Sequence, residues 1–237
     1  MDLGVRGKGY VIVGGTAGMG LAAARALARE GASIVLVGRD ADRGKNAAEE
    51  LIAAGAASAH AVASDVSQPG AAVAAVDEAV RILGRLDGIA ITMGTAGMMP
   101  IDSDDEAWDT AFHDVLLATT RSVQAALPHL AVNGGAIVTT AAYSARSPHE
   151  PRLPYASLKA AVATFTRGIA RTHGKSGIRA NSVAPAPWKP MRCMPSADTW
   201  PKAKAIPTTR RSSGRWWRTS VSTPRSVAPV SRTRSAR

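Results

Sequence analysis

The feature that most constrains this fold is an alternation of short apolar runs with longer alanine-rich stretches. The apolar runs occupy residues 10–14, 33–38, 60–64, 88–92, 136–140 and 180–184. Most are continuous in Val, Ile and Ala, which is typical of parallel strands buried on both faces. Helical stretches separate them at residues 21–30, 41–54, 71–83, 104–130 and 155–172. This repeated strand–helix order predicts an α/β fold with a doubly wound parallel sheet and helices on both faces.

Net positive charge is confined to the end of the chain. Among 237 residues, 29 are Lys or Arg and 18 are Asp or Glu, which gives a formal net charge of +11. Residues 188–237 contain 12 of the basic residues and one acidic residue, so residues 1–187 are balanced with 17 of each sign. We therefore predict one folded dinucleotide-binding domain over 1–187 and a basic, largely disordered tail over 188–237.

The body of the chain shows no sign of export, membrane insertion or metal binding. It contains no cysteine, since the single Cys193 lies in the tail, and this fits a reducing compartment. The apolar run near the N-terminus is far too short for a signal peptide or a membrane span. The five histidines show no metal-ligand spacing, and the acidic stretch at 102–109 is typical of helix N-capping. We expect a soluble cytoplasmic protein without a metal or a membrane partner.

A glycine-rich turn, GGTAGMG at residues 14–20, follows the first apolar run and precedes a helix. Glycine lets the backbone turn tightly and approach a pyrophosphate, whose charge is stabilised by the free N–H groups of the helix start. A tight strand–helix turn without any ligand is the alternative. The position after a first strand favours dinucleotide binding.

A second motif, YxxxK, places Tyr155 and Lys159 four residues apart on one face of an alanine-rich helix. A phenol with a pKa of about 10 is a poor base at neutral pH, and an adjacent ammonium group favours its ionised form. Tyr155 could then exchange a proton with a carbonyl oxygen while a nicotinamide exchanges hydride with the carbonyl carbon. The alternative is a solvated helix face, which is the common reason for this spacing.

Together these motifs resemble the short-chain dehydrogenase/reductase family, whose first turn reads TGxxxGxG. Gly14, Gly18 and Gly20 match that pattern, and Val13 stands where the family has Thr. The resemblance implies that Asp65 and Val66 lie against an adenine ring, and that the protein forms a homo-oligomer if its C-terminus is intact. The cofactor-binding residues that it implies are Gly14, Thr16, Gly18, Met19, Gly20, Arg39, Asp65, Val66, Gly94, Tyr155, Lys159 and Pro185.

The residue after the second strand indicates which cofactor is preferred. By resemblance, Gly38 and Arg39 occupy the positions that contact the adenosine ribose. A carboxylate there would bind the 2′-hydroxyl of NAD, whereas the guanidinium of Arg39 suits the 2′-phosphate of NADP. We therefore expect NADP(H), with NAD as the alternative and a solvated loop charge as the alternative role for Arg39.

Two positions depart from the catalytic residues of the family. Val115 stands at the position of an Asn in the long fourth helix, and Ala142 stands at the position of the family's Ser. Ser144 is two residues further on and could orient the substrate oxygen, or it could be an ordinary loop hydroxyl. We predict Tyr155, Lys159 and Ser144 as the catalytic residues.

The resemblance ends near residue 187. We shift the reading frame by joining the third base of each codon to the first two bases of the next. In the shifted frame, the segment that contains Trp188 and Lys189 can read APAPVET, which resembles the family's continuation. Glu at 189 and Ala at 195 and 201 are forced by the single codons of Trp and Met. We infer a one-base slip of the reading frame near codon 187, which would remove the last strand of the sheet.

Three functions follow from these observations. The first is an NAD(P)(H)-dependent oxidoreductase acting on a small carbonyl compound or secondary alcohol. The second, motivated by Val115 and Ala142, is a dinucleotide-binding protein without turnover. The third, the least favoured, is nucleic-acid binding by the basic tail, where Arg alternates with Trp.

Overall fold

The computed structural model describes residues 3–94, 99–148 and 152–185. The predicted tail at 188–237 lies outside the described residues, and so does the change of reading frame. Within the described part of the chain, no helix is long and apolar enough to cross a membrane.

The core of the fold is a six-stranded parallel sheet in the order β3-β2-β1-β4-β5-β6. Its strands are β1 (Gly9–Val13), β2 (Ser33–Gly38), β3 (Ser58–Ala63), β4 (Gly88–Ile91), β5 (Gly135–Thr140) and β6 (Ile178–Val183). The chain builds one half of the sheet outward from β1 and then returns to place β4 on the other side of β1. The predicted doubly wound α/β fold is therefore confirmed, and its switch point lies between β1 and β4.

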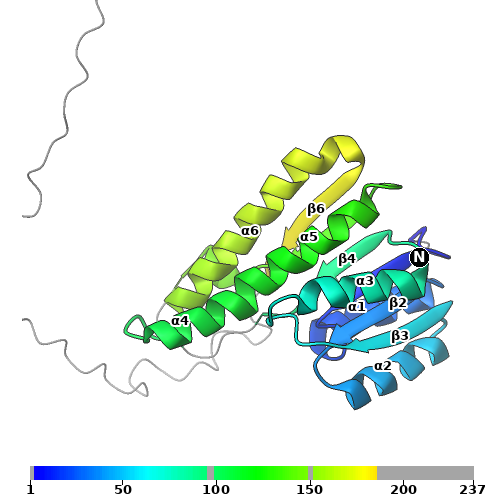
Figure 1. Cartoon of the computed structure of the whole chain (residues 1–237), viewed down its shortest axis with the longest axis horizontal. Coiled ribbons are helices and arrows are strands. Elements are labelled where there is room, and N and C mark those ends of the chain that lie inside the picture. The colour runs from blue at the N-terminus through cyan, green and yellow to red at the C-terminus, as the bar shows by residue number, and fades with distance from the viewer. Residues whose placement is uncertain (1–2, 95–98, 149–151, 186–237) are drawn as a thin grey trace, which may run out of the picture. The chain divides into compact units, whose positions relative to one another are not determined.

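In the described part of the chain, six α-helices connect these strands (Figure 1). They are α1 (Gly18–Arg29), α2 (Ala41–Ala53), α3 (Ala71–Leu83), α4 (Asp105–Ala111), α5 (Ala118–Leu130) and α6 (Leu153–His173). The boundaries follow local chemistry. Asp40 and Asp104 cap α2 and α4 by accepting hydrogen bonds from backbone N–H groups three residues on. The acidic stretch before α4 thus has the capping role expected from the sequence.

The long helix predicted over 104–130 is interrupted. A π-helical turn, Phe112–Leu117, separates α4 from α5, and Val115 lies fully buried within it. Hydrophobic periodicity does not locate a single π-turn, because the segments on both sides of it keep the period of an α-helix.

Each face of the sheet has its own hydrophobic core. Val11, Val13 and Val35 face α3, α5 and α6, which Figure 1 shows over one side of the sheet. Ile12, Ile34 and Leu36 point the other way and pack against α1 and α2. Parallel strands alternate their side chains between two helical layers, which explains why the strand sequences read as unbroken apolar runs.

Candidate functional site

The carboxyl ends of β1, β4 and β5 meet at one edge of the sheet, and the glycine turn lies there. Gly14 has a positive φ of 81°, and its N–H donates to the carbonyl of Val37 over 2.8 Å. The hydroxyl of Thr92, just after β4, donates to the carbonyls of Val13 (2.9 Å) and Gly14 (3.1 Å). A side chain at Gly20 would overlap the Gly14 carbonyl oxygen, so the turn and the start of α1 can pack this closely only with glycine.

The start of α1 is suited to an anion. Its N-cap residue, Ala17, makes no side-chain capping hydrogen bond, and its first turn contains no acidic residue. Gly18, with a φ of 55°, has open space where a side chain would stand, and Met19 is 54% exposed. Uncapped N–H groups at the positive end of a helix dipole bind phosphate groups. The pyrophosphate of a dinucleotide therefore fits these residues.

The end of β2 forms the next part of this edge. Gly38 lies against Thr16, whose methyl carbon would be 2.7 Å from a Cβ placed on Gly38. Arg39 is exposed. Its positive charge helps to lower the pKa of Asp65, although the larger cause is the hydrogen bond that the Ser67 hydroxyl donates to the Asp65 carboxylate over 2.7 Å. Val66 is buried. The structure thus brings Thr16, Arg39 and Asp65, three of the cofactor-binding residues that the resemblance implies, into one neighbourhood.

Lys159 is the largest fully buried side chain among the described residues, with 1% of its surface exposed. Its Nζ donates hydrogen bonds to the carbonyl of Thr140 over 2.8 Å and of Met93 over 3.4 Å, at the ends of β5 and β4. Burial lowers the pKa of Lys159 to about 8, because desolvation disfavours the charged form. Gly94 allows this approach, since a Cβ there would lie 3.3 Å from Nζ.

Tyr155 lies one turn before Lys159, with the Lys159 Nζ 5.8 Å from the centre of its ring. The guanidinium carbon of Arg152 is 5.6 Å from the same ring. Burial raises the pKa of Tyr155, and the Arg152 charge offsets this only in part. The expected lowering of the Tyr155 pKa by Lys159 is therefore wrong. Lys159 is itself desolvated, and its ammonium group is directed to backbone carbonyls.

Ser144 lies in a short 3₁₀ turn, Tyr143–Ala145, directly after β5. Its side chain is 7% exposed, and its Oγ is a buried polar atom without a hydrogen-bond partner. A buried unpaired hydroxyl destabilises a folded chain, and a role in binding or catalysis is one reason for keeping it. The Tyr143 N–H donates to the carbonyl of Pro185 over 3.3 Å, which places Pro185 beside the same turn. Ala142 precedes the turn in extended conformation.

Val115 also lies at this edge. A Cβ on Gly94 would be 3.2 Å from the Cα of Val115 and 3.2 Å from the carbonyl oxygen of Asp114. The π-turn thus packs directly against the segment that accepts a hydrogen bond from Lys159. Replacing the family's Asn by Val removes the polar side chain but leaves the backbone in contact with this part of the site.

Sequence reasoning missed two contributors to the site. Thr92 is not among the predicted site residues, yet its hydroxyl holds the glycine turn to β4. Arg152 is not among the predicted residues either, although it directly precedes α6, three positions before Tyr155, and lies over the Tyr155 ring. Its sequence spacing could have indicated this contact.

Comparison with known proteins extends over most of the chain. Residues 14–215 match a family model described as enoyl-(acyl carrier protein) reductase. This match passes residue 187, where we expected the resemblance to end. The Bacillus subtilis protein called uncharacterized oxidoreductase YvrD is 31% identical over 189 residues, which covers 79% of this chain and 71% of the relative. Two further bacterial oxidoreductases are matched over 65% and 61% of their length, so the chain spans less than two thirds of these two proteins.

Solved structures of similar fold contain nicotinamide cofactors of both kinds. L-sorbose reductase from Gluconobacter frateurii, complexed with NADPH and L-sorbose, is 33% identical with a TM-score of 0.74, covering 78% of this chain and 71% of that one. An NADH-dependent reductase, A1-R′, complexed with NAD, is 26% identical with a TM-score of 0.73, covering 77% and 79%. Similar proteins thus use either cofactor.

Proposed function

Because the chain belongs to the short-chain dehydrogenase/reductase family, we propose that it transfers hydride between NADP(H) and a small carbonyl compound or secondary alcohol. The observation that carries the proposal is the fully buried Lys159 beside Tyr155, at the sheet edge that also holds the glycine turn. Burying a lysine without a carboxylate partner destabilises the fold and is characteristic of functional sites.

Tyr155 is the proposed proton donor to the carbonyl oxygen in the direction of reduction. Its raised pKa keeps the phenol protonated at neutral pH, as a donor requires. Lys159 remains close enough to favour the phenolate once the proton has left. The unpaired Oγ of Ser144 is the proposed donor that orients the substrate oxygen, in place of the hydroxyl that Ala142 lacks. A bound nicotinamide supplies the hydride chemistry.

Arg39 is the proposed determinant for NADP(H). It is exposed beside Gly38 and Thr16, and its planar guanidinium suits bidentate binding of a phosphate. The negative charge of Asp65 weakens phosphate binding at Arg39, because it attracts the same guanidinium.

The test is NADPH oxidation across a panel of aldehydes and ketones with the full chain. Tyr155→Phe should abolish turnover because it removes the proton donor, whereas Tyr143→Phe, an exposed tyrosine near Ser144, should not. Equal rates in the chain and in Tyr155→Phe would contradict the assignment. A second comparison, Ser144→Ala, should lower kcat without weakening cofactor binding.

Val115 and Ala142 favour a second candidate function, dinucleotide binding without turnover. Val115 is fully buried and brings no polar side chain to the site. On this alternative the cofactor binds but no carbonyl substrate is reduced, and the double substitution Val115→Asn with Ala142→Ser creates activity. If that double variant is as inactive as the parent chain, loss of these two side chains does not explain the lack of turnover.

We also propose that the reading frame slips near codon 187. On the face of the sheet opposite α6, β6 exposes Asn181 and Val183 in its second half, and no helix among the described residues covers them. Parallel strands are normally covered on both faces, so a covering element is expected after β6. Resequencing the native coding DNA across codons 180–237 tests this proposal. A one-base insertion or deletion near codon 187 would support the slip and favour the family's homo-oligomer. A coding sequence that agrees with the printed chain would refute the slip.

A further inference from the structure

A cavity of about 700 Å³ lies at the end of the sheet where the strands begin, opposite the glycine turn. It is bordered by the start of β1, the α3–β4 turn, the α5–β5 turn and the α6–β6 turn. No residue of the candidate functional site lines it. Its charged and aromatic lining residues are Lys8, Tyr10, Arg85, Asp87, Lys175 and Arg179.

The strand register gives this cavity its floor. Tyr10, Gly88, Ala136 and Arg179 are aligned across β1, β4, β5 and β6. The two central residues are small, so a hollow remains between the two large outer side chains. The ring of Tyr10 lies over Gly88, since a Cβ on that glycine would be 2.9 Å from the ring.

Backbone forms the wall on the side of β5 and β6. Gly134 and Gly177 both have positive φ angles, 71° and 73°, and the Gly135 N–H donates to the Gly177 carbonyl over 3.2 Å. A Cβ on Gly134 would be 2.9 Å from that same carbonyl oxygen. The two turns therefore pack together without side chains between them.

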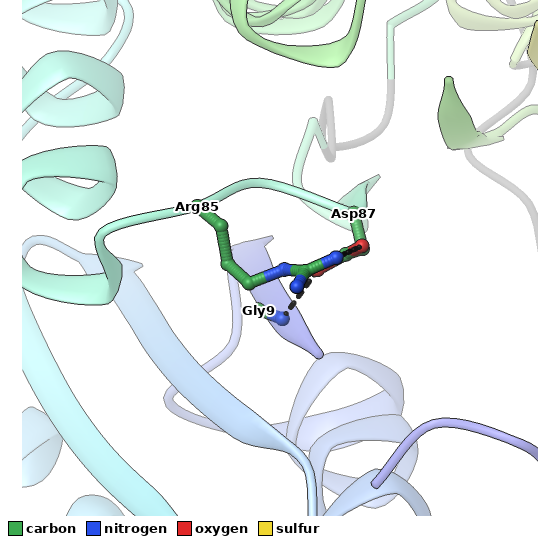
Figure 2. Close-up of polar contacts among 3 residues, drawn as sticks. All are labelled: Gly9, Arg85 and Asp87. Carbon is green, nitrogen blue, oxygen red and sulfur yellow. Dashed lines mark hydrogen bonds and ion pairs between the residues drawn. The ribbon is translucent and has the colours of Figure 1, made fainter. Parts of the chain in front are cut away.

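Figure 2 shows the opposite wall, where Arg85 and Asp87 form a fixed pair. The Nε and Nη2 of Arg85 donate to the Asp87 carboxylate over 2.7 and 2.6 Å, and the Gly9 N–H donates to it over 2.8 Å. The carboxylate is thereby neutralised. Nη1 of Arg85 makes no hydrogen bond with any described residue.

The remaining charges of the cavity are positive. Lys8, Lys175 and Arg179 have no carboxylate within ion-pair distance in the part of the chain that the structure describes. Basic residues here also complement helix C-termini, because α3, α5 and α6 all end at this edge. Each helix end contributes roughly half a negative charge, so a surplus of roughly one to two positive charges remains after this compensation.

We propose that this cavity binds a small phosphate-bearing anion with at least two negative charges. Arg179 and Lys175 supply charge-assisted hydrogen bonds from one side, and Arg85 from the other. The phenol of Tyr10 is half-buried and without a hydrogen-bond partner among the described residues, so it can serve as a neutral donor. Burial and the Asp87 charge raise the pKa of Tyr10, which keeps that phenol protonated.

The experiment is a titration of the ¹⁵N-labelled full chain with inorganic pyrophosphate, followed residue by residue by NMR. Saturable shifts are expected at the amides of Gly134, Gly135 and Gly177. The double variant Lys175→Gln with Arg179→Gln should weaken this binding by about tenfold or more, as expected when charged hydrogen bonds are lost. Arg167→Gln with Arg171→Gln removes the same charge from the exposed surface of α6 and should leave the binding unchanged.

Residue-resolved shifts separate this proposal from the proposed function. Pyrophosphate at the dinucleotide turn would shift the amides of residues 14–20, and these shifts should survive the Lys175→Gln, Arg179→Gln change. Weak, unsaturable shifts at Gly134 and Gly177 would overturn the proposal. So would an equal loss of pyrophosphate affinity in both double variants. A parallel titration with ADP identifies the source: tighter binding than pyrophosphate at these glycines indicates a nucleotide, and equal binding indicates the phosphates alone.

Discussion

The two halves of the candidate site use different parts of the chain, backbone groups in one and side chains in the other. The dinucleotide turn is made of backbone: glycines, an uncapped helix start and carbonyls held by Thr92. The proposed catalytic half depends on side chains, namely a buried Lys159, a half-buried Tyr155 and an unpaired Ser144 hydroxyl. A backbone site tolerates much sequence change as long as its glycines remain, whereas a side-chain site loses function when single residues are replaced. Val115 and Ala142 lie in the second half.

The largest expected effect is on the catalytic half alone. Tyr155→Phe removes the proposed proton donor but keeps the ring, so kcat should fall by about 10³-fold, far more than the affinity for the cofactor. Stopped-flow turnover and cofactor titration on the same samples measure both quantities. A parallel loss of cofactor affinity would mean that the two halves are not separable.

The second prediction concerns the buried charge of Lys159. Its pKa is about 8 in the folded chain and about 10.5 when exposed, so the unfolded chain binds more protons between these values. The free energy of unfolding should therefore rise with pH in this window, by ~3 kcal/mol at most, relative to Lys159→Met. The carbonyls of Thr140 and Met93 favour the charged form and reduce this gain.

Urea unfolding of the chain and of Lys159→Met from pH 7 to 10.5 makes the measurement. Other titrating groups are common to both proteins and cancel in the difference. If the two stability curves run parallel across the window, the buried ammonium is fully compensated by its hydrogen bonds, and the expected penalty is absent.

The third prediction tests the backbone half. Gly20→Ala places a methyl group against the Gly14 carbonyl and 2.5 Å from Thr92 Oγ1, so it should destabilise the fold by ~1–3 kcal/mol and weaken cofactor binding. Gly168→Ala is the matched control, because this glycine lies inside α6 and the added methyl would meet no described atom within 4 Å beyond its chain neighbours and the backbone of its own helix. That change should stabilise by ~0.5–1 kcal/mol. Similar destabilisation by both would show that the turn is not unusually crowded.

The sequence predicted the backbone features better than the side-chain environment. All six strands and the helix starts at 41 and 71 follow from apolar runs and glycine or aspartate boundaries, which are local signals. The π-turn around Val115 has no such signal, because it arises where the 104–130 segment packs against α6 and Gly94. The raised pKa of Tyr155 likewise depends on burial, which the four-residue spacing to Lys159 does not reveal.

The smallest expected effect concerns Arg39, a side chain within the backbone half. Arg39→Gln removes the guanidinium proposed to bind the 2′-phosphate, so the affinity for NADPH should fall by about tenfold, as for one charged hydrogen-bonding partner at an exposed site. The affinity for NADH should not change. Arg43→Gln is the control, since Arg43 is also exposed but pairs with Asp40 at the start of α2. If Arg39→Gln weakens both cofactors alike, the residue contributes general positive charge. If Arg39→Gln weakens the binding of NADPH alone, the preference for this cofactor depends on a side chain, in contrast to the backbone groups that form the rest of the dinucleotide-binding half.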